Sequence, residues 1–155
     1  MDDERKLLER RVLGFGIRTG RIAPDDPTQV DVAFVQVNGK RMLPIVEGAE
    51  ALAQDLEAAF ATGLGTDLLN LGFGFDGLKT IAEEENRAMQ SERIRASAAA
   101  VLVRDARVRT VVEVTVAAGP PARPGRRPIH AVVECLFETV LGQRERVTFG
   151  RDLDE

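Results

Sequence analysis

The chain has 155 residues, of which 44% are hydrophobic and 30% charged, as in a globular protein that buries its own core. Its formal net charge of -4 argues against a nucleic-acid partner, because such domains usually carry a basic surface. The acidic start Met1-Asp2-Asp3-Glu4 differs from a signal peptide, and the single cysteine, Cys135, cannot form an internal disulfide. We therefore expect assembly in a reducing cytoplasm. No apolar run has the roughly 20 residues that span a bilayer.

The first 29 residues are predicted to be an N-terminal arm and an irregular segment. Leu7, Leu8 and Val12 have helical spacing, and acidic residues precede basic ones, the order that a helix dipole favours. Both a short helix and an arm that a partner orders fit this pattern. The run Pro24-Asp25-Asp26-Pro27 is typical of a turn.

A β-hairpin and an amphipathic helix are expected next. Residues 30–46 contain two apolar or alternating runs around Asn38-Gly39, a strong two-residue hairpin turn. Pro44 should end the second strand early or place it at a sheet edge. Residues 47–61 then carry apolar side chains at spacings of three and four, which predicts one buried helix face.

The glycine-rich stretch after this helix is predicted to be a structural loop. Residues 72–77 are a literal G-x-G-x-x-G, but a dinucleotide site also needs a second parallel strand that ends in an acid about 20 residues further on. Helical pattern continues instead to Ala100. We expect Gly74 to need a backbone conformation closed to side chains, or a close approach to Phe60, and Phe73 and Phe75 to plug the core. The predicted loop residues are Thr62, Gly65, Gly72, Phe73 and Gly74.

The rest of the chain is predicted to form two helices and three strands. The helices cover residues 78–89 and a stretch that Ser91 caps and that extends to Leu102, in which Ile94, Ala98, Val101 and Leu102 share one face. The expected strands are 108–117, 129–141 and 146–149, with a proline-rich loop over 118–128 and an acidic end. The fold class is α+β, with helices packed on one face of a mostly antiparallel sheet. The predicted limits are 1–29 for the arm, 30–150 for a single domain and 151–155 for the tail.

The strand over residues 129–141 has two different faces. Ile129, Ala131, Val133, Cys135 and Phe137 point one way, whereas His130, Glu134 and Glu138 alternate with apolar residues on the other. At about 3.3 Å per residue this strand would reach roughly 40 Å, well beyond a typical strand. It should therefore bend at a bulge or outrun its neighbours, and a strand that outruns its neighbours can pair with another chain.

Three short motifs, in this order, carry a resemblance to a known family. They are Thr62-Gly63-Leu64-Gly65-Thr66-Asp67, then Leu71-Gly72-Phe73-Gly74, then Asp105-Ala106-Arg107. The chain resembles the small baseplate wedge family of contractile phage tails and related injection systems over roughly Val12 to Val140. Members usually carry Thr-x-x-Gly-Glu-Arg, Pro-Asp-Phe-Gly and Glu-Pro-Arg at these places. The glycines, one Phe and the last Arg match, whereas the first Arg, the Pro and the Glu do not.

The resemblance implies a structural role as a wedge component and sheath initiator in a phage tail-like particle. Such proteins join two larger wedge proteins through helical contacts and present sheet edges resembling those of the sheath, in six copies per particle. Arg107 is then expected to leave the helix before it and point at a partner, because a guanidinium makes several directed bonds. We expect no direct contact with a membrane. The candidate partner contacts are Asp105, Arg107, Arg126, Arg127, His130, Glu134 and Glu138.

An enzymatic function is an alternative, because members of this family have been described as lysozyme-like. Glycoside hydrolysis needs two carboxylates across one cleft, whereas Glu134 and Glu138 should lie roughly 13 Å apart on one strand. Trp and Tyr, the usual platforms for sugars, are absent. His130 and Cys135 lie on opposite strand faces, and one His with one Cys makes no zinc set. No catalytic, cofactor or metal site is predicted.

Two alternatives therefore stay open beside the wedge component. A non-catalytic protein-interaction domain of another assembly is the first, and a small glycoside hydrolase is the less favoured second. Arg123, Arg126 and Arg127 form a local basic tip in the proline-rich loop. This tip is either solvated or a contact for an acidic partner.

Overall fold

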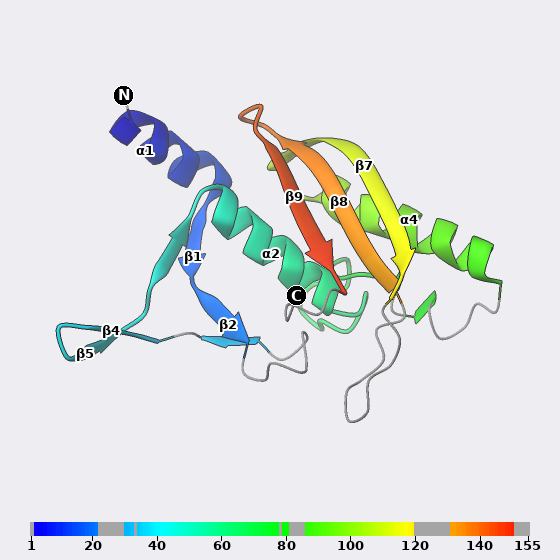
Figure 1. Ribbon diagram of the computed structural model, residues 1–155, viewed down its shortest axis with the longest axis horizontal. Helices are drawn as coiled ribbons and strands as arrows, with labels where there is room; N and C mark the ends of the chain where they lie inside the picture. The colour runs from blue at the N-terminus through cyan, green and yellow to red at the C-terminus, as the bar shows by residue number, and fades with distance from the viewer. Residues whose placement is uncertain are drawn as a thin grey trace. The chain divides into compact units, whose positions relative to one another are not determined.

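The computed structural model describes residues 2–21, 30–32, 34–77, 79–80, 86–119 and 131–150. It has an α+β fold with helices and antiparallel sheets (Figure 1). By its internal contacts the chain divides into two compact units, and the division falls between Gln54 and Asp55, inside a helix. The predicted domain limits at 30 and 150 stay a prediction.

The first unit consists of a helix, three small antiparallel strand pairs and the start of a second helix. The elements are α1 Asp2–Leu13, β1 Phe15–Ile17, β2 Thr19–Arg21, β3 Val30–Val32, β4 Val35–Val37, β5 Lys40–Met42, β6 Ile45–Glu47 and α2 Ala49–Ala61. β1 pairs with β6, β2 with β3, and β4 with β5. Gln54 of α2 accepts from the Thr19 N–H and donates to the Ile17 carbonyl, both at 2.9 Å. A single side chain thereby ties α2 to the chain between β1 and β2.

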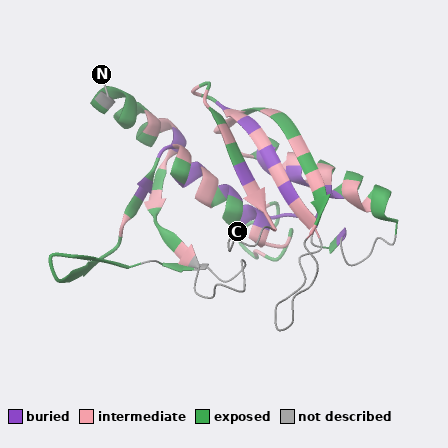
Figure 2. Cartoon of the chain, viewed as in Figure 1, coloured by how far each residue is buried: buried purple, intermediate pink, exposed green. Residues whose placement is uncertain are grey.

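The expected hairpin turn is confirmed, but the hairpin, β4 and β5, covers only residues 35–42 of the predicted 30–46, because β3 pairs with β2 and β6 with β1. Asn38 and Gly39 at the turn have φ angles of 51° and 77°, the left-handed pair that a type I′ turn requires. β5 ends at Met42 and β6 starts at Ile45, so the chain around Pro44 separates two strands, as expected. All side chains of β4 and β5 are exposed (Figure 2).

The second unit contains the end of α2, the glycine-rich loop, α4 (Arg87–Arg104), β7 (Val108–Ala118), β8 (Ala131–Thr139) and β9 (Arg144–Phe149). The strands form one antiparallel sheet in the order β7-β8-β9, and α4 packs on it through β7 and β8 (Figure 1). Ile94, Ala98, Val101 and Leu102 form the buried face of α4, which confirms the predicted face. The predicted α+β class is therefore observed.

The start of α4 differs from the prediction. Asn86 is the N-cap, because its side chain accepts hydrogen bonds from the N–H groups of Ala88 and Met89, whereas Ser91 lies inside the helix. Residues 87–90 consequently belong to α4 and not to a separate preceding helix. An Asx side chain satisfies free N–H groups at a helix start as well as a serine does, so spacing alone did not distinguish the two caps.

β8 shows the predicted alternation, but it lies in the middle of the sheet. Val133, Cys135, Phe137 and Thr139 are buried, and the residues between them are partly exposed (Figure 2). β7 flanks β8 on one side and β9 on the other. The prediction that this strand outruns its neighbours is therefore wrong for residues 133–138, which pair on both sides, whereas Ala131 and Val132 pair with β7 alone among the described strands. The irregularity falls on β7, whose register against β8 shifts between Val108 and Thr110 and again between Val111 and Glu113.

Candidate functional site

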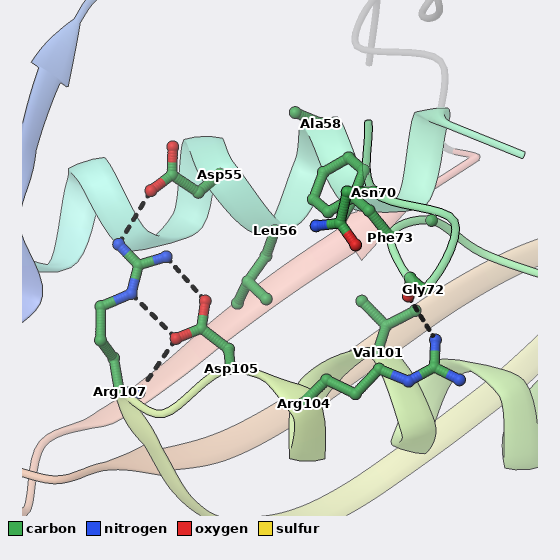
Figure 3. Close-up of a pocket in the computed structure, with 12 residues that line it drawn as sticks. Asp55, Leu56, Ala58, Asn70, Gly72, Phe73, Val101, Arg104, Asp105 and Arg107 are labelled. Carbon is green, nitrogen blue, oxygen red and sulfur yellow. Dashed lines mark hydrogen bonds and ion pairs between the residues drawn. The ribbon is translucent and has the colours of Figure 1, made fainter. Parts of the chain in front are cut away.

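A hollow of about 580 Å³ lies in the second unit between α2, the glycine-rich loop and the end of α4 (Figure 3). It brings together residues of two of the sequence motifs, Gly72 and Gly74 from the loop and Asp105 and Arg107 after α4. The polar side chains that line it are Asp55, Asn70, Arg104, Asp105 and Arg107. We take this hollow as the candidate site because it combines space, charge and the motif residues.

Arg107 is held by two carboxylates of its own chain. Its Nε donates to Asp105 Oδ1 at 2.9 Å and its second terminal nitrogen lies 2.6 Å from Asp105 Oδ2. Its other terminal nitrogen donates to Asp55 Oδ2 at 2.8 Å, 52 residues away in the sequence. Figure 3 shows the guanidinium lying between these two carboxylates. The cluster fixes the chain after α4 against the second half of α2.

These bonds favour the charged forms of both partners. Burial raises the pKa of Asp105, but its hydrogen bonds to Arg107 and the charge of that guanidinium outweigh burial and leave the pKa below its usual value. The hydrogen bond to Asp105 raises the pKa of Arg107 against the effect of burial, and the bond to Asp55 adds to this rise. The ion pair therefore stays charged at neutral pH.

The expected orientation of Arg107 needs correction. Its guanidinium points at Asp105 and Asp55, and not away from its own chain, because the turn after α4 places Asp105 within bidentate reach. That Arg107 and Asp105 contact a partner protein stays a prediction. Asp55 was missed by the sequence reasoning, since it lies on the polar side of a predicted helix and no local pattern links it to Arg107.

Gly74 closes the glycine-rich loop against its own beginning. The φ angle of Gly74 is +110°, and a Cβ there would lie 2.7 Å from the Thr62 carbonyl oxygen. The next residue, Phe75, donates its N–H to that same carbonyl at 2.8 Å. The close neighbour is therefore the backbone of Thr62 and Gly63 rather than Phe60, and the expectation of a conformation closed to side chains is confirmed.

The two loop phenylalanines have different roles. The ring of Phe75 is buried and lies 5.3 Å from the Phe60 ring and 6.0 Å from the Phe149 ring. Phe73 is half-buried and lines the hollow, so it is not a core residue. Of the other predicted loop residues, Thr62 bonds the Ala58 carbonyl, Gly65 has a φ angle of 79°, and the Gly72 carbonyl accepts from Arg104 at 3.1 Å.

The G-x-G-x-x-G stretch does not follow a strand. Residues 67–71 form turns, in which the Asn70 N–H bonds the Asp67 carbonyl and the Phe73 N–H bonds the Asn70 carbonyl. The next long element is α4, followed by the antiparallel strands β7 and β8. This order differs from the parallel strand, helix and strand that bind a dinucleotide.

The predicted contacts on the strand lie on the sheet face opposite α4 or outside the described residues. Glu134 pairs with Arg146 at 2.9 Å and Glu138 with Arg109 at 3.6 Å. These two carboxylates are thus engaged across strands and lie apart from the hollow. His130, Arg123, Arg126 and Arg127 lie outside the described residues, as does the tail over 151–155.

Cys135 is a core residue on β8. Its side chain is buried, and burial, with the negative charge of Glu134 adding, raises the pKa of the thiol to about 12. We expect that Cys135 in the native protein will not react with iodoacetamide at pH 8 over an hour, and that it will be fully alkylated in 8 M urea. Mass spectrometry of both samples checks this. Rapid native alkylation would show that β8 opens far more readily than a central strand should.

Within the described residues, no group of three or more His, Cys, Asp or Glu side chains could hold a metal ion. No helix of the part that the structure describes is long and apolar enough to cross a membrane. Comparison of the chain with family models, curated proteins and solved structures found no match.

Proposed function

We propose that the protein is a structural, non-catalytic baseplate wedge component of a contractile tail or injection system. In this role it joins larger wedge proteins and initiates the sheath, working in six copies assembled in the cytoplasm. The observation that carries the proposal is the meeting of the three motifs in one place. Gly74 packs on Thr62 and Gly63, and the hollow beside Gly74 is lined by Asp105 and Arg107.

The hollow suits a contact with a larger protein better than it suits catalysis. A general acid of a glycosidase needs a raised pKa, whereas that of Asp105 is lowered. The hollow is bordered by the surface charges of Asp55 and Arg104 and has an apolar floor that includes Leu56 and Val101. A helix from a wedge protein could place an apolar side chain there and polar groups at its rim.

We propose β9 as the edge that pairs with the sheath. The Thr139 N–H donates to the Gln143 carbonyl at 2.8 Å, and in an antiparallel pair the bonded positions alternate. In the observed register, Glu145, Val147 and Phe149 then bond to β8. The N–H and C=O groups of Arg144, Arg146 and Thr148 therefore point away from β8, and no described strand pairs with them.

The opposite edge, β7, is less suited to strand addition. Val114 faces outward by the same alternation, and its carbonyl already accepts from Arg95 Nε of α4 at 3.1 Å. The two register shifts on β7 also disturb its ladder. Bulges and capped carbonyls are common ways of protecting an edge. β9 is thus the regular edge, with three outward positions in six residues.

A proline on β9 tests this proposal. Arg146→Pro removes one outward N–H and leaves the bonds to β8 in place, so the protein should fold while sheaths fail to form on baseplates that carry it. Arg146→Ala is the matched control, since it loses the same pairing with Glu134 but keeps the N–H. Electron micrographs of the particles and circular dichroism of both variants are the measurements.

The outcome separates the wedge component from the alternatives. Normal-length sheaths on baseplates with folded Arg146→Pro, and with the corresponding Thr148→Pro, would rule out pairing at β9. Neighbouring genes for sheath, tube and spike would support the wedge assignment. Their absence would favour the interaction domain of another assembly, which the many exposed apolar side chains of the first unit, such as Phe15, Phe34 and Ile45, also fit.

A further inference from the structure

The β4–β5 hairpin of the first unit leaves an apolar face uncovered. Directly opposite residues of an antiparallel pair share a face, so Val35, Val37 and Met42 lie on one face in the observed register, together with Lys40. All side chains of β4 and β5 are exposed, so no described element covers this face (Figure 2). A two-stranded hairpin alone is only marginally stable in water. We therefore expect another surface to cover it.

The hairpin is also basic. Residues 32–46 contain Lys40 and Arg41 but no Asp or Glu. The acid before this stretch, Asp31, bonds the N–H of the next residue, and the acid after it, Glu47, pairs with an arginine of α1. Two hairpins would repel each other through their cations, so a surface that covers this one should be both apolar and acidic.

The glycine-rich loop of the second unit has that combination. Leu68 is 88% exposed, Leu69 99% and Leu71 64%. Three such side chains on one short loop form an apolar patch, which we call the leucine patch. Asp67 directly precedes it, and residues 62–77 contain no Lys or Arg. The loop thus combines exposed apolar side chains with negative charge, whereas the hairpin combines them with positive charge.

Hydrogen bonds keep Asp67 beside the leucine patch. Its carboxylate accepts from the Leu69 N–H at 2.9 Å, and its carbonyl accepts from the Asn70 N–H at 3.2 Å. A carboxylate has acceptor sites for several donors, so Asp67 can also bind a lysine of another chain. Arg104 contacts the same loop at the Gly72 carbonyl. These two residues line the hollow of about 580 Å³, whereas none of the three leucines lines it.

We propose that the β4–β5 hairpin of one copy of the chain docks on the leucine patch of a second copy. The hairpin face with Val35, Val37 and Met42 covers the leucines, and Lys40 of that face binds Asp67. The two contacting surfaces differ, so the contact is heterologous. Each copy can then bind one neighbour through its hairpin and another through its leucine patch.

This contact between copies goes beyond the proposed function and uses neither β9 nor Arg107. It is small, and small interfaces are transient, so isolated copies should associate weakly. In the proposed particle, six copies would be held at a high effective concentration, which strengthens a weak contact without new interactions. That strengthening rests on the proposed function, whereas the contact itself does not.

A lipid surface fits the hairpin less well. Lys40 and Arg41 directly follow the turn at Asn38 and Gly39, so they lie near the tip, ahead of most of the apolar residues. A hairpin that entered a bilayer would carry these charges in first, which is costly. A carboxylate at the protein surface can bind them without moving them out of water.

Sedimentation equilibrium of the purified full chain tests the proposal. We expect the weight-average mass to rise with protein concentration. Val37→Ser with Lys40→Glu changes the hairpin, and Asp67→Asn with Leu69→Ser changes the loop. Each of these two double variants should lower the association constant at least tenfold. The amide that replaces the carboxylate can still accept from the N–H of residue 69, so the loop variant keeps its turn.

A mixture of the two double variants identifies the head-to-tail arrangement. The hairpin variant keeps its leucine patch and the loop variant keeps its hairpin, so an equimolar mixture should form a dimer with one copy of each and nothing larger. Lys6→Glu with Leu7→Ser is the matched control, because both residues are exposed on α1. It should associate as the wild type does.

Three results would overturn the proposal. The first is a chain that stays monomeric at every concentration. The second is association that either double variant leaves unchanged while circular dichroism shows a folded protein. The third is a mixture that stays monomeric, or a monomeric chain that binds phosphatidylglycerol vesicles through its hairpin. Sheath formation enters none of these measurements, so the wedge role and the contact between copies are tested separately.

Discussion

Replacing Gly74 by valine is expected to lower the free energy of unfolding by about 3 kcal/mol, through backbone strain and overpacking together. The φ angle of +110° is one that side chains rarely adopt, and the new Cβ would lie 2.7 Å from the Thr62 carbonyl oxygen and 2.9 Å from the Gly63 carbonyl carbon. That backbone cannot easily withdraw, because Phe75 is bonded to the same Thr62 carbonyl and its ring packs on Phe60. Urea unfolding followed by circular dichroism measures the loss.

Gly72→Ala is the matched control within the same loop. The nearest atom to a Cβ at Gly72 is the Asn70 side-chain oxygen at 3.7 Å, an ordinary contact distance. The control should therefore change the unfolding free energy by less than about 0.5 kcal/mol. If Gly74→Val unfolds at the same urea concentration as the wild type, this account of the loop is wrong. The packing of Gly74 on Thr62 and Gly63, which brings the first two motifs together in the wedge proposal, would then lack support.

Periodicity was sufficient to predict most of the second unit. The alternation along β8 and the spacing of Ile94, Ala98, Val101 and Leu102 were read correctly, because a repeat of buried residues reports directly on the side of an element that faces the core. Asn38-Gly39 was equally informative, since few residue pairs accept two left-handed φ angles. Each of these signals is local, within a single strand, helix or turn.

The errors concern interactions between distant parts of the chain. The sequence of β8 does not state that β7 and β9 both flank it, so a strand that outruns its neighbours was one of the two expectations drawn from its length. Asp55 bonds Arg107 across 52 residues, and nothing within α2 distinguishes Asp55 from the other polar residues of that helix. Phe73 and Phe75 are chemically identical, and the backbone turn between them decides which ring enters the core.

The same long-range contacts connect the candidate site to the fold. The ring cluster of Phe60, Phe75 and Phe149 joins α2, the loop and the last residue of β9. The carboxylates around Arg107 join α2 to the chain that enters β7. Asp55, Leu56 and Arg107 line the hollow, so its shape depends on how the second half of α2 meets the chain after α4. A partner bound there would stabilise that arrangement by linkage.

Arg107→Ala is expected to destabilise the isolated protein by about 1–2 kcal/mol at pH 7. Removing one member of a buried ion pair costs roughly 3–5 kcal/mol, but the Arg107 side chain is 24% exposed and that of Asp55 56%, so solvent reduces the loss. Arg109→Ala is the matched control, because Arg109 is 64% exposed and lies 3.6 Å from Glu138. It should change stability by less than about 0.5 kcal/mol.

The effect of Arg107→Ala should also depend on pH in a definite direction. The pKa of Asp105 is lowered in the folded protein from its usual 3.8, so the pair contributes fully above about pH 4. That contribution disappears as the pH falls through the lowered value, because the unfolded chain binds the proton more readily there. Urea midpoints at pH 7 and pH 3 should therefore show a smaller difference between Arg107→Ala and the wild type at pH 3. An equal difference at both values would show that Arg107 stabilises the protein through packing and not through its charge.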